Sequence, residues 1–187
     1  MPLVHFSKQF AVADAKIKKI TADPAGGTTT FATAIDIPGI KSVDLTGTVN
    51  IKRLRGDNTL LDVNSVLESL SVKYNYAKEQ LDARAVYVGG TVSDSGTTPN
   101  MVAKWALDNA GVPGYFQFEA KTPTNGVDFV GGDAHLLLYR CMVSNFPGLG
   151  FAEEDYKLFE VEADAMPRLS DGKWIDLLFN ETAVAIS

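Results

Sequence analysis

The chain has 187 residues, of which 45% are apolar, and it carries a formal net charge of −6. This length and apolar content suit a single domain over 1–187 with a real hydrophobic core. The acidic balance argues against a free-standing nucleic-acid binder, which needs a basic surface to neutralise phosphates. No stretch reaches the roughly 18 consecutive apolar residues of a membrane-spanning helix.

Residues 1–40 are expected to form an N-terminal arm and the first strands of the fold. The N-terminus shows no basic region followed by an apolar region, so no signal peptide is predicted and the protein is expected in a cytosol. Cys141 is the only cysteine, which leaves no internal disulfide. Its place in an apolar run predicts a packed thiol rather than a reactive one.

Apolar and polar residues alternate strictly from Lys41 to Ile51. Successive side chains of a strand point to opposite faces, so this segment predicts a long strand with one apolar face and one wet face. The small polar side chains of the wet face are Ser42, Asp44, Thr46, Thr48 and Asn50. A second alternating run covers 70–76. Together the two runs predict a long hairpin over 41–76, with residues 52–64 as its loop.

Further strands follow along the chain. Runs with strand character occupy 101–107, 115–119, 135–143, 159–165 and 173–179. The run at 135–143 lacks alternation, which is typical of a strand covered on both faces. Asp171-Gly172 is a hairpin-type turn between two such runs.

One helix is predicted, over 78–88, because Leu81, Ala85 and Val88 recur at helical spacing and Gly89-Gly90 supplies a stop. Many strands and a single short helix are typical of a mostly-β fold. We therefore expect an antiparallel β-sandwich or barrel with one short α-helix packed on its side.

Catalytic and metal-binding patterns are absent from the sequence. The two histidines, His5 and His135, are far apart and neither lies in a ligand-like cluster. His135, at the head of a strand, is interpreted as a strand-end residue rather than a ligand or a base. No nucleophile elbow or phosphate-binding loop is present. The sequence thus predicts no metal, no cofactor and no enzyme activity.

The carboxylates Glu160, Glu162 and Asp164 share one face of a predicted strand, about 7 Å apart. Three interpretations are open for them. They can form a solvated face, a repulsive acidic lining, or a catalytic acid–base pair, and the first accounts for them most simply.

A resemblance to a known family rests on the order of several motifs. An amphipathic strand runs into a charged, leucine-containing segment (45–62) with a Gly-Asp turn, and the strand at 70–76 follows. The short helix ending at Gly89-Gly90 then precedes a Ser/Gly/Thr loop over 91–99. The C-terminal part has a Leu-Phe-Glu-Val-Glu-Ala run, an Asp-Gly turn and a strand containing Trp174. From about Lys41 to Thr182, this order resembles the tail tube proteins, the major tail proteins of long-tailed bacteriophages.

The resemblance implies a structural virion protein that self-assembles in the host cytoplasm and functions in the tail. Six copies would form a ring, and stacked rings would form a tube with a β-barrel around its lumen. Its partners would be copies of itself, a tape-measure protein, and tail terminator or baseplate proteins, with DNA only as transiting cargo and no membrane.

Residues are assigned to these contacts on the hairpin and on the later acidic strand. The expected inter-ring or subunit contacts are Leu54, Arg55, Asp57, Leu60 and Leu61, on a loop expected to be mobile in the monomer and ordered in the tube. The lumen would be lined either by Asp44, Thr46, Thr48 and Asn50 or by Glu160, Glu162 and Asp164.

Two other classes stay open. A tube subunit of a contractile tail or a tail-like injection machine would have the same sequence features. A non-catalytic β-sandwich module that binds carbohydrate or a receptor could use Tyr74, Tyr76, Phe116 and Phe118 as a binding face.

Overall fold

The computed structural model describes residues 7–57, 59–150 and 156–186. The protein is mostly β and antiparallel, with one helix in these ranges, which confirms the predicted fold class. The first five strands are β1 (Asp14–Ala22), β2 (Thr30–Phe31), β3 (Ile35–Asp36), β4 (Ile40–Gly56) and β5 (Thr59–Tyr76). The helix α1 (Leu81–Val88) is followed by β6 (Thr91–Ser95), β7 (Val102–Ala106), β8 (Phe116–Lys121), β9 (Asp133–Val143), β10 (Phe159–Ala165) and β11 (Ile175–Asn180).

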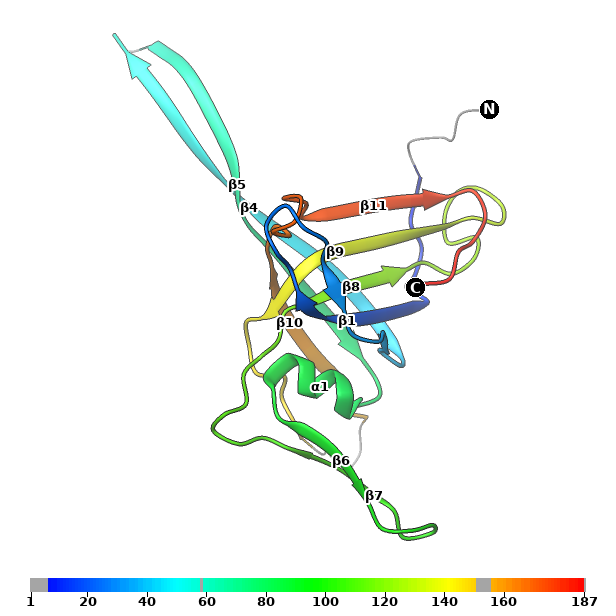
Figure 1. The fold of residues 1–187 in the computed structure, drawn as a ribbon. Coiled ribbons are helices and arrows are strands. Elements are labelled where there is room, and N and C mark those ends of the chain that lie inside the picture. Colours follow the sequence, from blue (N-terminus) through cyan, green and yellow to red (C-terminus); the bar gives the residue numbers. More distant parts are fainter. Residues whose placement is uncertain (1–6, 58, 151–155, 187) are drawn as a thin grey trace.

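Nine of the strands form one curled sheet (Figure 1). Its main order is β2-β1-β8-β9-β10-β5-β4, while β3 pairs with β1 and β11 pairs with β9. Tyr74 of β5 stacks on Phe118 of β8, with ring centroids 4.6 Å apart. Because β9 and β10 separate these two strands in the sheet order, this contact requires the sheet to fold over on itself. The hydrophobic core lies inside the curl.

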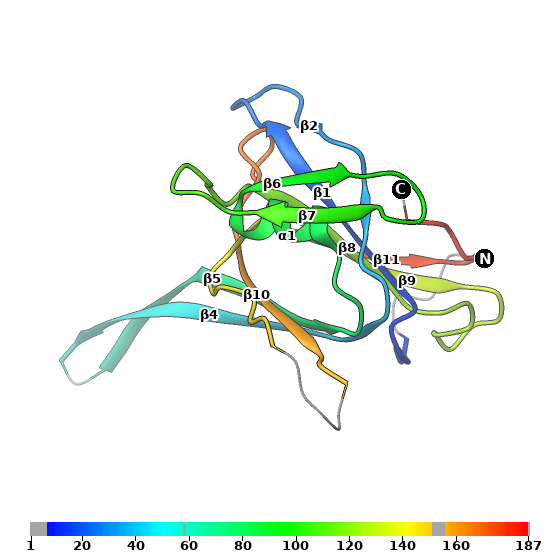
Figure 2. The ribbon, with the colours of Figure 1, turned by 90° about the horizontal axis from the view of Figure 1, so that it is seen from below.

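The helix α1 covers the open side of the curled sheet (Figure 2). The ring of Tyr87 packs against Tyr74 and Phe116, at centroid distances of 6.4 and 5.5 Å. The β6–β7 hairpin follows directly and contacts α1. Gly90 joins the two elements with a φ of +89°, and a Cβ atom there would lie 2.4 Å from the carbonyl oxygen of Ala106. Only glycine fits this turn.

A β-bulge redirects the sheet at β9. Phe118 pairs with Leu138, but Phe116 pairs with Cys141, so β9 contains an extra residue between the two pairs. The edge of β9 opposite β8 is then shared, with β11 on its first half and β10 on its last three residues. Bulges increase local twist, which lets the sheet turn from the β8–β9 half into the β10–β5–β4 half.

The expected hairpin at Asp171-Gly172 forms only in part. The turn is present, with the Gly172 N–H donating to the Arg168 carbonyl at 2.8 Å. However, β10 and β11 do not pair with each other. Each of them pairs with β9 instead. The prediction that this turn joins two paired strands is wrong, because the bulge in β9 provides each strand with a separate length of edge.

The longest feature is the β4–β5 hairpin, which projects from the body (Figure 1). The two strands have 17 and 18 residues, and their pairing continues to Gly56 and Thr59. The loop predicted over 52–64 is therefore wrong: these residues form paired strand up to a tight turn at Asp57, where φ is +47°. Charged side chains suit this ribbon because both of its faces meet solvent. Beyond Gly47 the ribbon extends roughly 30 Å.

Most of the other predicted elements match the structure. The predicted strands at 101–107, 115–119, 135–143, 159–165 and 173–179 correspond to β7, β8, β9, β10 and β11, and the helix begins at Leu81 in place of residue 78. The loop expected over 91–99 is wrong, because β6 occupies 91–95 and pairs with β7.

Candidate functional site

The polar residues of β4, β5 and β10 form one continuous surface. Asp44 pairs with Lys73, and Lys73 pairs with Glu162 on its other side. Cross-strand partners share a face of the sheet, so the two polar rows that the sequence left as alternatives lie side by side. The neighbouring rows are Ser42, Asn75 and Glu160, and then Thr46, Ser71 and Asp164. We name these nine residues the polar face.

The polar face lies on the outside of the curled sheet because the intervening residues form the core. Val72 and Tyr74 alternate with the polar side chains of β5, and Val161 and Ala163 with those of β10; all four are fully buried. The polar and apolar side chains that alternate along each strand therefore face the same two sides in three adjacent strands. This strict separation gives a wet surface backed by a packed layer.

Side-chain contacts tie the strands of the polar face together. The Ser71 hydroxyl donates to Asp164 Oδ1 at 2.7 Å. Lys73 Nζ lies 2.8 Å from Glu160 Oε1, and this hydrogen bond raises the pKa of Lys73 above its ordinary value. Both members of the Lys73–Glu160 pair are about half exposed, so the pair contributes little to stability.

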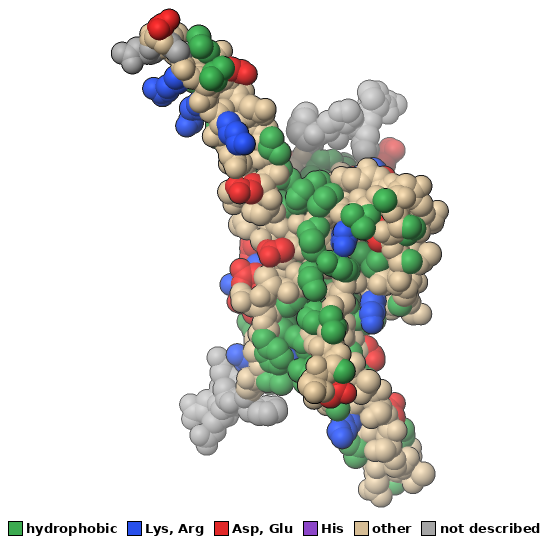
Figure 3. Space-filling model, turned by 60° about the vertical axis from the view of Figure 1, so that its left-hand side comes forward, with side chains coloured by type: hydrophobic (Ala, Val, Ile, Leu, Met, Phe, Trp, Pro, Cys, Tyr) green, Lys and Arg blue, Asp and Glu red, His purple; other side chains and the backbone are tan. Residues whose placement is uncertain are grey.

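The charge of the polar face is negative. It contains four carboxylates, from Asp44, Glu160, Glu162 and Asp164, and one ammonium group, from Lys73. Acidic side chains gather where the hairpin joins the body, whereas Lys and Arg side chains lie with further acidic ones nearer its end (Figure 3). A polyanion such as DNA would be repelled by the base of the hairpin rather than held there.

Thr48 and Asn50 extend the polar face along the projecting hairpin. A bulge between Thr48 and Val49 shifts the register, and Asn50 then pairs with Val66. All the lumen residues proposed from the sequence, from both strands, thus lie on one side of the β4–β5–β10 sheet. The structure brings together what the sequence treated as two alternatives.

The opposite face of the projecting hairpin is mainly apolar, apart from Arg53 and Ser65, and it is uncovered by described residues. It continues the core face of the sheet beyond the body, and its apolar side chains are Leu45, Val49, Ile51, Val63 and Leu67, each between 36% and 51% exposed. We name these five residues the apolar stripe. Outer edges are open as well: in the described ranges β4 pairs only with β5, and residues 59–69 of β5 pair only with β4. Exposed strand edges of this kind favour pairing with another chain.

The residues proposed for subunit contact lie at the end of the hairpin but do not form one patch. Arg55 pairs with Leu60, whereas Leu54 faces Asp62 on the other side of the ribbon. Leu54, Leu60 and Leu61 are 61%, 50% and 63% exposed. Asp57 forms the turn. The hairpin end therefore presents apolar side chains to both sides.

The aromatic residues considered as a binding face are interior residues. Tyr74, Tyr76, Phe116 and Phe118 are all fully buried. They fill the space between the two halves of the curled sheet, so the interpretation of these side chains as an exposed face is wrong.

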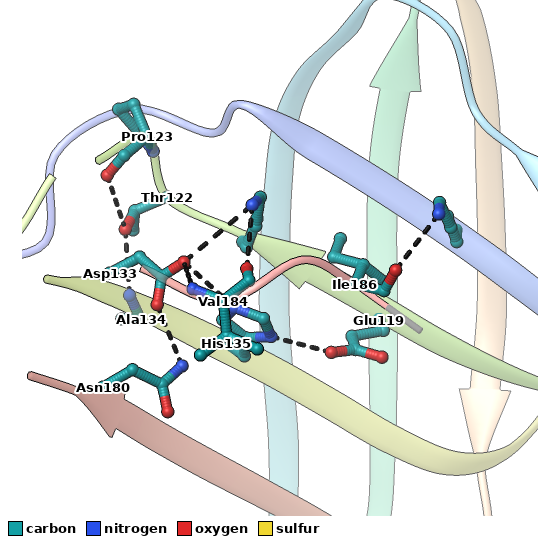
Figure 4. A network of polar contacts seen from close by, with 11 residues as sticks. Glu119, Thr122, Pro123, Asp133, Ala134, His135, Asn180, Val184 and Ile186 are labelled. Atoms are coloured by element: carbon teal, nitrogen blue, oxygen red, sulfur yellow. Dashed lines mark hydrogen bonds and ion pairs between the residues drawn. The ribbon is translucent and has the colours of Figure 1, made fainter. Parts of the chain in front are cut away.

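His135 lies in a buried network that the sequence analysis missed. It is the third residue of β9 and 3% exposed, with Glu119 and Asp133 on its two ring nitrogens. Glu119 lies on β8, 16 residues away, and no local pattern signals this pairing (Figure 4).

His5 lies outside the described residues. Cys141 is fully buried, as expected, and burial raises the pKa of its thiol well above the ordinary value.

Comparisons with known proteins do not assign the chain to a family: no family model and no curated protein matches it. Within the described ranges, no group of three or more His, Cys, Asp or Glu side chains is arranged to hold a metal ion. In the same ranges, no helix is long and apolar enough to cross a membrane.

Proposed function

We propose that this chain is a structural subunit that assembles with copies of itself into stacked rings around a channel, as tail tube proteins of long-tailed bacteriophages do. The observation that carries the proposal is the polar face, which places both predicted lumen rows on the outer side of β4, β5 and β10. In the assembly this face lines the channel, and the packed core lies behind it.

The chemistry of the polar face suits a passage for DNA. A channel that held phosphates with Lys and Arg would trap the polymer by releasing counterions. Small hydroxyl and amide groups with a net negative charge give a wet wall that repels phosphates instead. The subunit would act passively, with no catalytic step.

The projecting hairpin supplies the surfaces for assembly. Its open edges can continue a sheet into the neighbouring subunit, and closure of such a sheet into a shared barrel removes the edges. Burial of the apolar stripe against a neighbour contributes a favourable free energy of about 25 cal/mol for each Å² of apolar surface removed from water. A contact between different surfaces of successive copies does not close on itself, so it produces a filament of stacked rings.

The partners and location follow from this assignment. The proposed partners are ring neighbours and stacked rings of the same chain, a tape-measure protein inside the channel, and terminator or baseplate proteins at its ends. The proposed location is the tail of a virion assembled in the host cytoplasm.

Electron microscopy of the purified chain, concentrated at neutral pH and moderate salt, tests the proposal. Rings or hollow tubes of uniform diameter are the expected result. Dispersed monomers at every concentration would contradict unaided assembly and would favour a binding module, for which a glycan screen is the next measurement.

A further inference from the structure

A pocket with a volume of about 500 Å³ lies where β5 ends and β10 begins. Its walls come from β5, from the segment that follows β9, and from β10 with the two residues before it. The lining residues include Asn75, Asn145, Phe146, Leu158, Glu160 and Glu162. The pocket therefore shares part of its wall with the polar face.

The segment after β9 is a fixed wall of this pocket. The Ser144 N–H donates to the Glu162 carbonyl at 2.9 Å, and Asn145 Nδ2 donates to Glu162 Oε2 at 2.5 Å. Farther along the same segment, the buried guanidinium of Arg84 in α1 donates to the Pro147 carbonyl at 3.1 Å. Because the wall is anchored to both β10 and α1, the pocket is formed in the free subunit.

Apolar surface and carboxylate groups are combined in the pocket. Phe146 and Leu158 are 59% and 47% exposed. Glu160 already pairs with Lys73, and Glu162 already accepts a bond from an amide. A carboxylate has about four lone-pair sites, so both groups can accept a further donor. The pocket thus suits a segment that carries an apolar side chain next to a cation.

The end of the β4–β5 hairpin carries this pair of groups. Arg55 and Leu60 are cross-strand partners, so a guanidinium lies beside a leucine on one side of the ribbon. Within the described ranges, Arg55 forms no ion pair in its own chain. Leu54 is exposed on the other side of the ribbon. A ribbon end with apolar groups on both sides buries more of them by insertion into a pocket than by contact with a flat surface.

The hairpin end and the pocket lie at opposite ends of the same strand. β5 begins at Thr59, next to the hairpin turn, and ends at Tyr76, which pairs with Phe159 at the start of β10. Its 18 residues span roughly 60 Å, and the hairpin points away from the rest of the molecule (Figure 1). A copy shifted along this strand brings its hairpin end to the pocket of the next copy. The contact joins two different surfaces, so it repeats without closing.

We propose that this pocket receives the hairpin end of a second copy of the chain. Leu60 packs against Phe146 and Leu158. Arg55 lies beside the carboxylates of Glu160 and Glu162. The pocket contact rests on the proposed function, because it supplies the receiving surface for the stacked rings. The channel wall then continues from one ring into the next.

Cross-linking between two variants tests the contact. Thr59→Cys places a thiol beside Leu60, and Lys157→Cys places one in the pocket without removing an apolar side chain or a carboxylate. The native Cys141 thiol is buried and does not react. Mixed with a short bismaleimide, the two chains should form a linked dimer, which a denaturing gel detects and peptide mass spectrometry assigns to the two positions.

Lys104→Cys on β7 is the matched control for Lys157→Cys, because it replaces another exposed lysine outside the pocket. Paired with Thr59→Cys, the Lys157→Cys chain should give at least about tenfold more linked dimer than the control, since a modest free-energy preference for the pocket is enough for this ratio. Equal yields, or a larger yield with Lys104→Cys, would overturn the proposal.

Further variants test the chemistry of the contact. Arg55→Glu in the Thr59→Cys chain should lower the yield at least about tenfold, because like charges then face one another. Glu162→Arg in the Lys157→Cys chain should restore much of the lost yield. If Glu162→Arg fails to fold, Phe146→Asp, at an exposed position of the wall, should lower the yield with the unchanged hairpin. A yield that none of these variants alters would contradict the pocket contact.

Electron microscopy of the unmodified chain separates the pocket contact from the proposed function. Rings or tubes without the specific cross-link would overturn the pocket contact and leave the proposed function in place. A specific cross-link without rings or tubes would support the pocket contact and count against stacked rings around a channel. If neither the particles nor the cross-link form, both are overturned.

Discussion

Ser71 and Asp164 are joined by a hydrogen bond of 2.7 Å that links β5 to β10 across the polar face. The two residues are 93 positions apart in the chain, yet they are direct cross-strand partners. Through this pairing, the acidic strand near the C-terminus becomes the neighbour of the hairpin that begins at Ile40. The proposed channel wall is therefore a product of tertiary structure and not of a single segment.

Replacement of Leu60 and Leu61 with serine should block ring stacking without unfolding the subunit. Both side chains are at least half exposed in the monomer, so the free energy of unfolding should change by no more than about 0.5 kcal/mol per residue. Leu169→Ser is a matched control, since Leu169 is also 50% exposed but lies outside the hairpin, where its backbone N–H donates to Asp23. Normal polymerisation of the double variant, measured by sedimentation and electron microscopy, would remove the hairpin end from the stacking contact.

Arg84→Ala should destabilise the subunit by about 3–5 kcal/mol, because it leaves Glu79 without its partner in a largely buried site. The Arg84 guanidinium is 1% exposed, binds both carboxylate oxygens of Glu79 at 2.7 and 2.9 Å, and donates to the Pro147 carbonyl. Lys73→Ala removes an ion pair of similar length whose two partners are half exposed, so it should lower stability far less than Arg84→Ala does. Urea unfolding of both variants measures how much stability each one loses. Equal losses would contradict the argument that burial makes the Arg84–Glu79 pair more important than the Lys73–Glu160 pair.

Asp23 should make the free energy of unfolding depend on pH in the acid range. Burial alone would raise its pKa, but the Leu169 N–H, the Thr29 hydroxyl, the Ser170 N–H and Arg140 together lower it below the ordinary value. A carboxyl group with a lowered folded-state pKa stabilises the fold fully above its unfolded pKa of about 3.9, and the contribution disappears as the pH falls through the folded value.

The measurement is urea unfolding of wild type and Asp23→Asn between pH 7 and pH 2.5. The variant should be less stable at pH 7, because it loses charge-assisted hydrogen bonds, and its stability should fall less steeply below about pH 4. An identical pH dependence in both proteins would show that Asp23 does not contribute.

Much of the fold could be predicted from local patterns, because alternation reports which residues of a strand face the core. The wet face at Asp44 and the acidic face at Glu160 were both readable in this way. Their adjacency was not, because it depends on the pairing of β5 with β10, which no local pattern specifies.

Two features escape prediction from the sequence, for different reasons. The sequence predicts a loop over 52–64 because this segment carries charges and exposed leucines, and because the apolar row of β4 is interrupted at Arg53. A two-stranded ribbon with both faces in solvent tolerates such residues, so polarity does not mark its end. The environment of His135 was missed for the opposite reason: it comes from Glu119 on another strand and from a segment near the C-terminus.

Thiol accessibility in assembled particles tests the central claim most directly. Thr48→Cys places a thiol on the proposed lumen side of β4, and Ser95→Cys places one on β6, which lies beyond α1 on the core side of the sheet (Figures 1 and 2). In monomers, both thiols should react with a maleimide that carries a long polyethylene glycol chain. In assembled particles, the reaction at Thr48→Cys should slow sharply while a small maleimide still reacts there, and Ser95→Cys should be unaffected. Equal reactivity of the two positions toward the polymer in assembled particles would contradict a channel lined by the polar face.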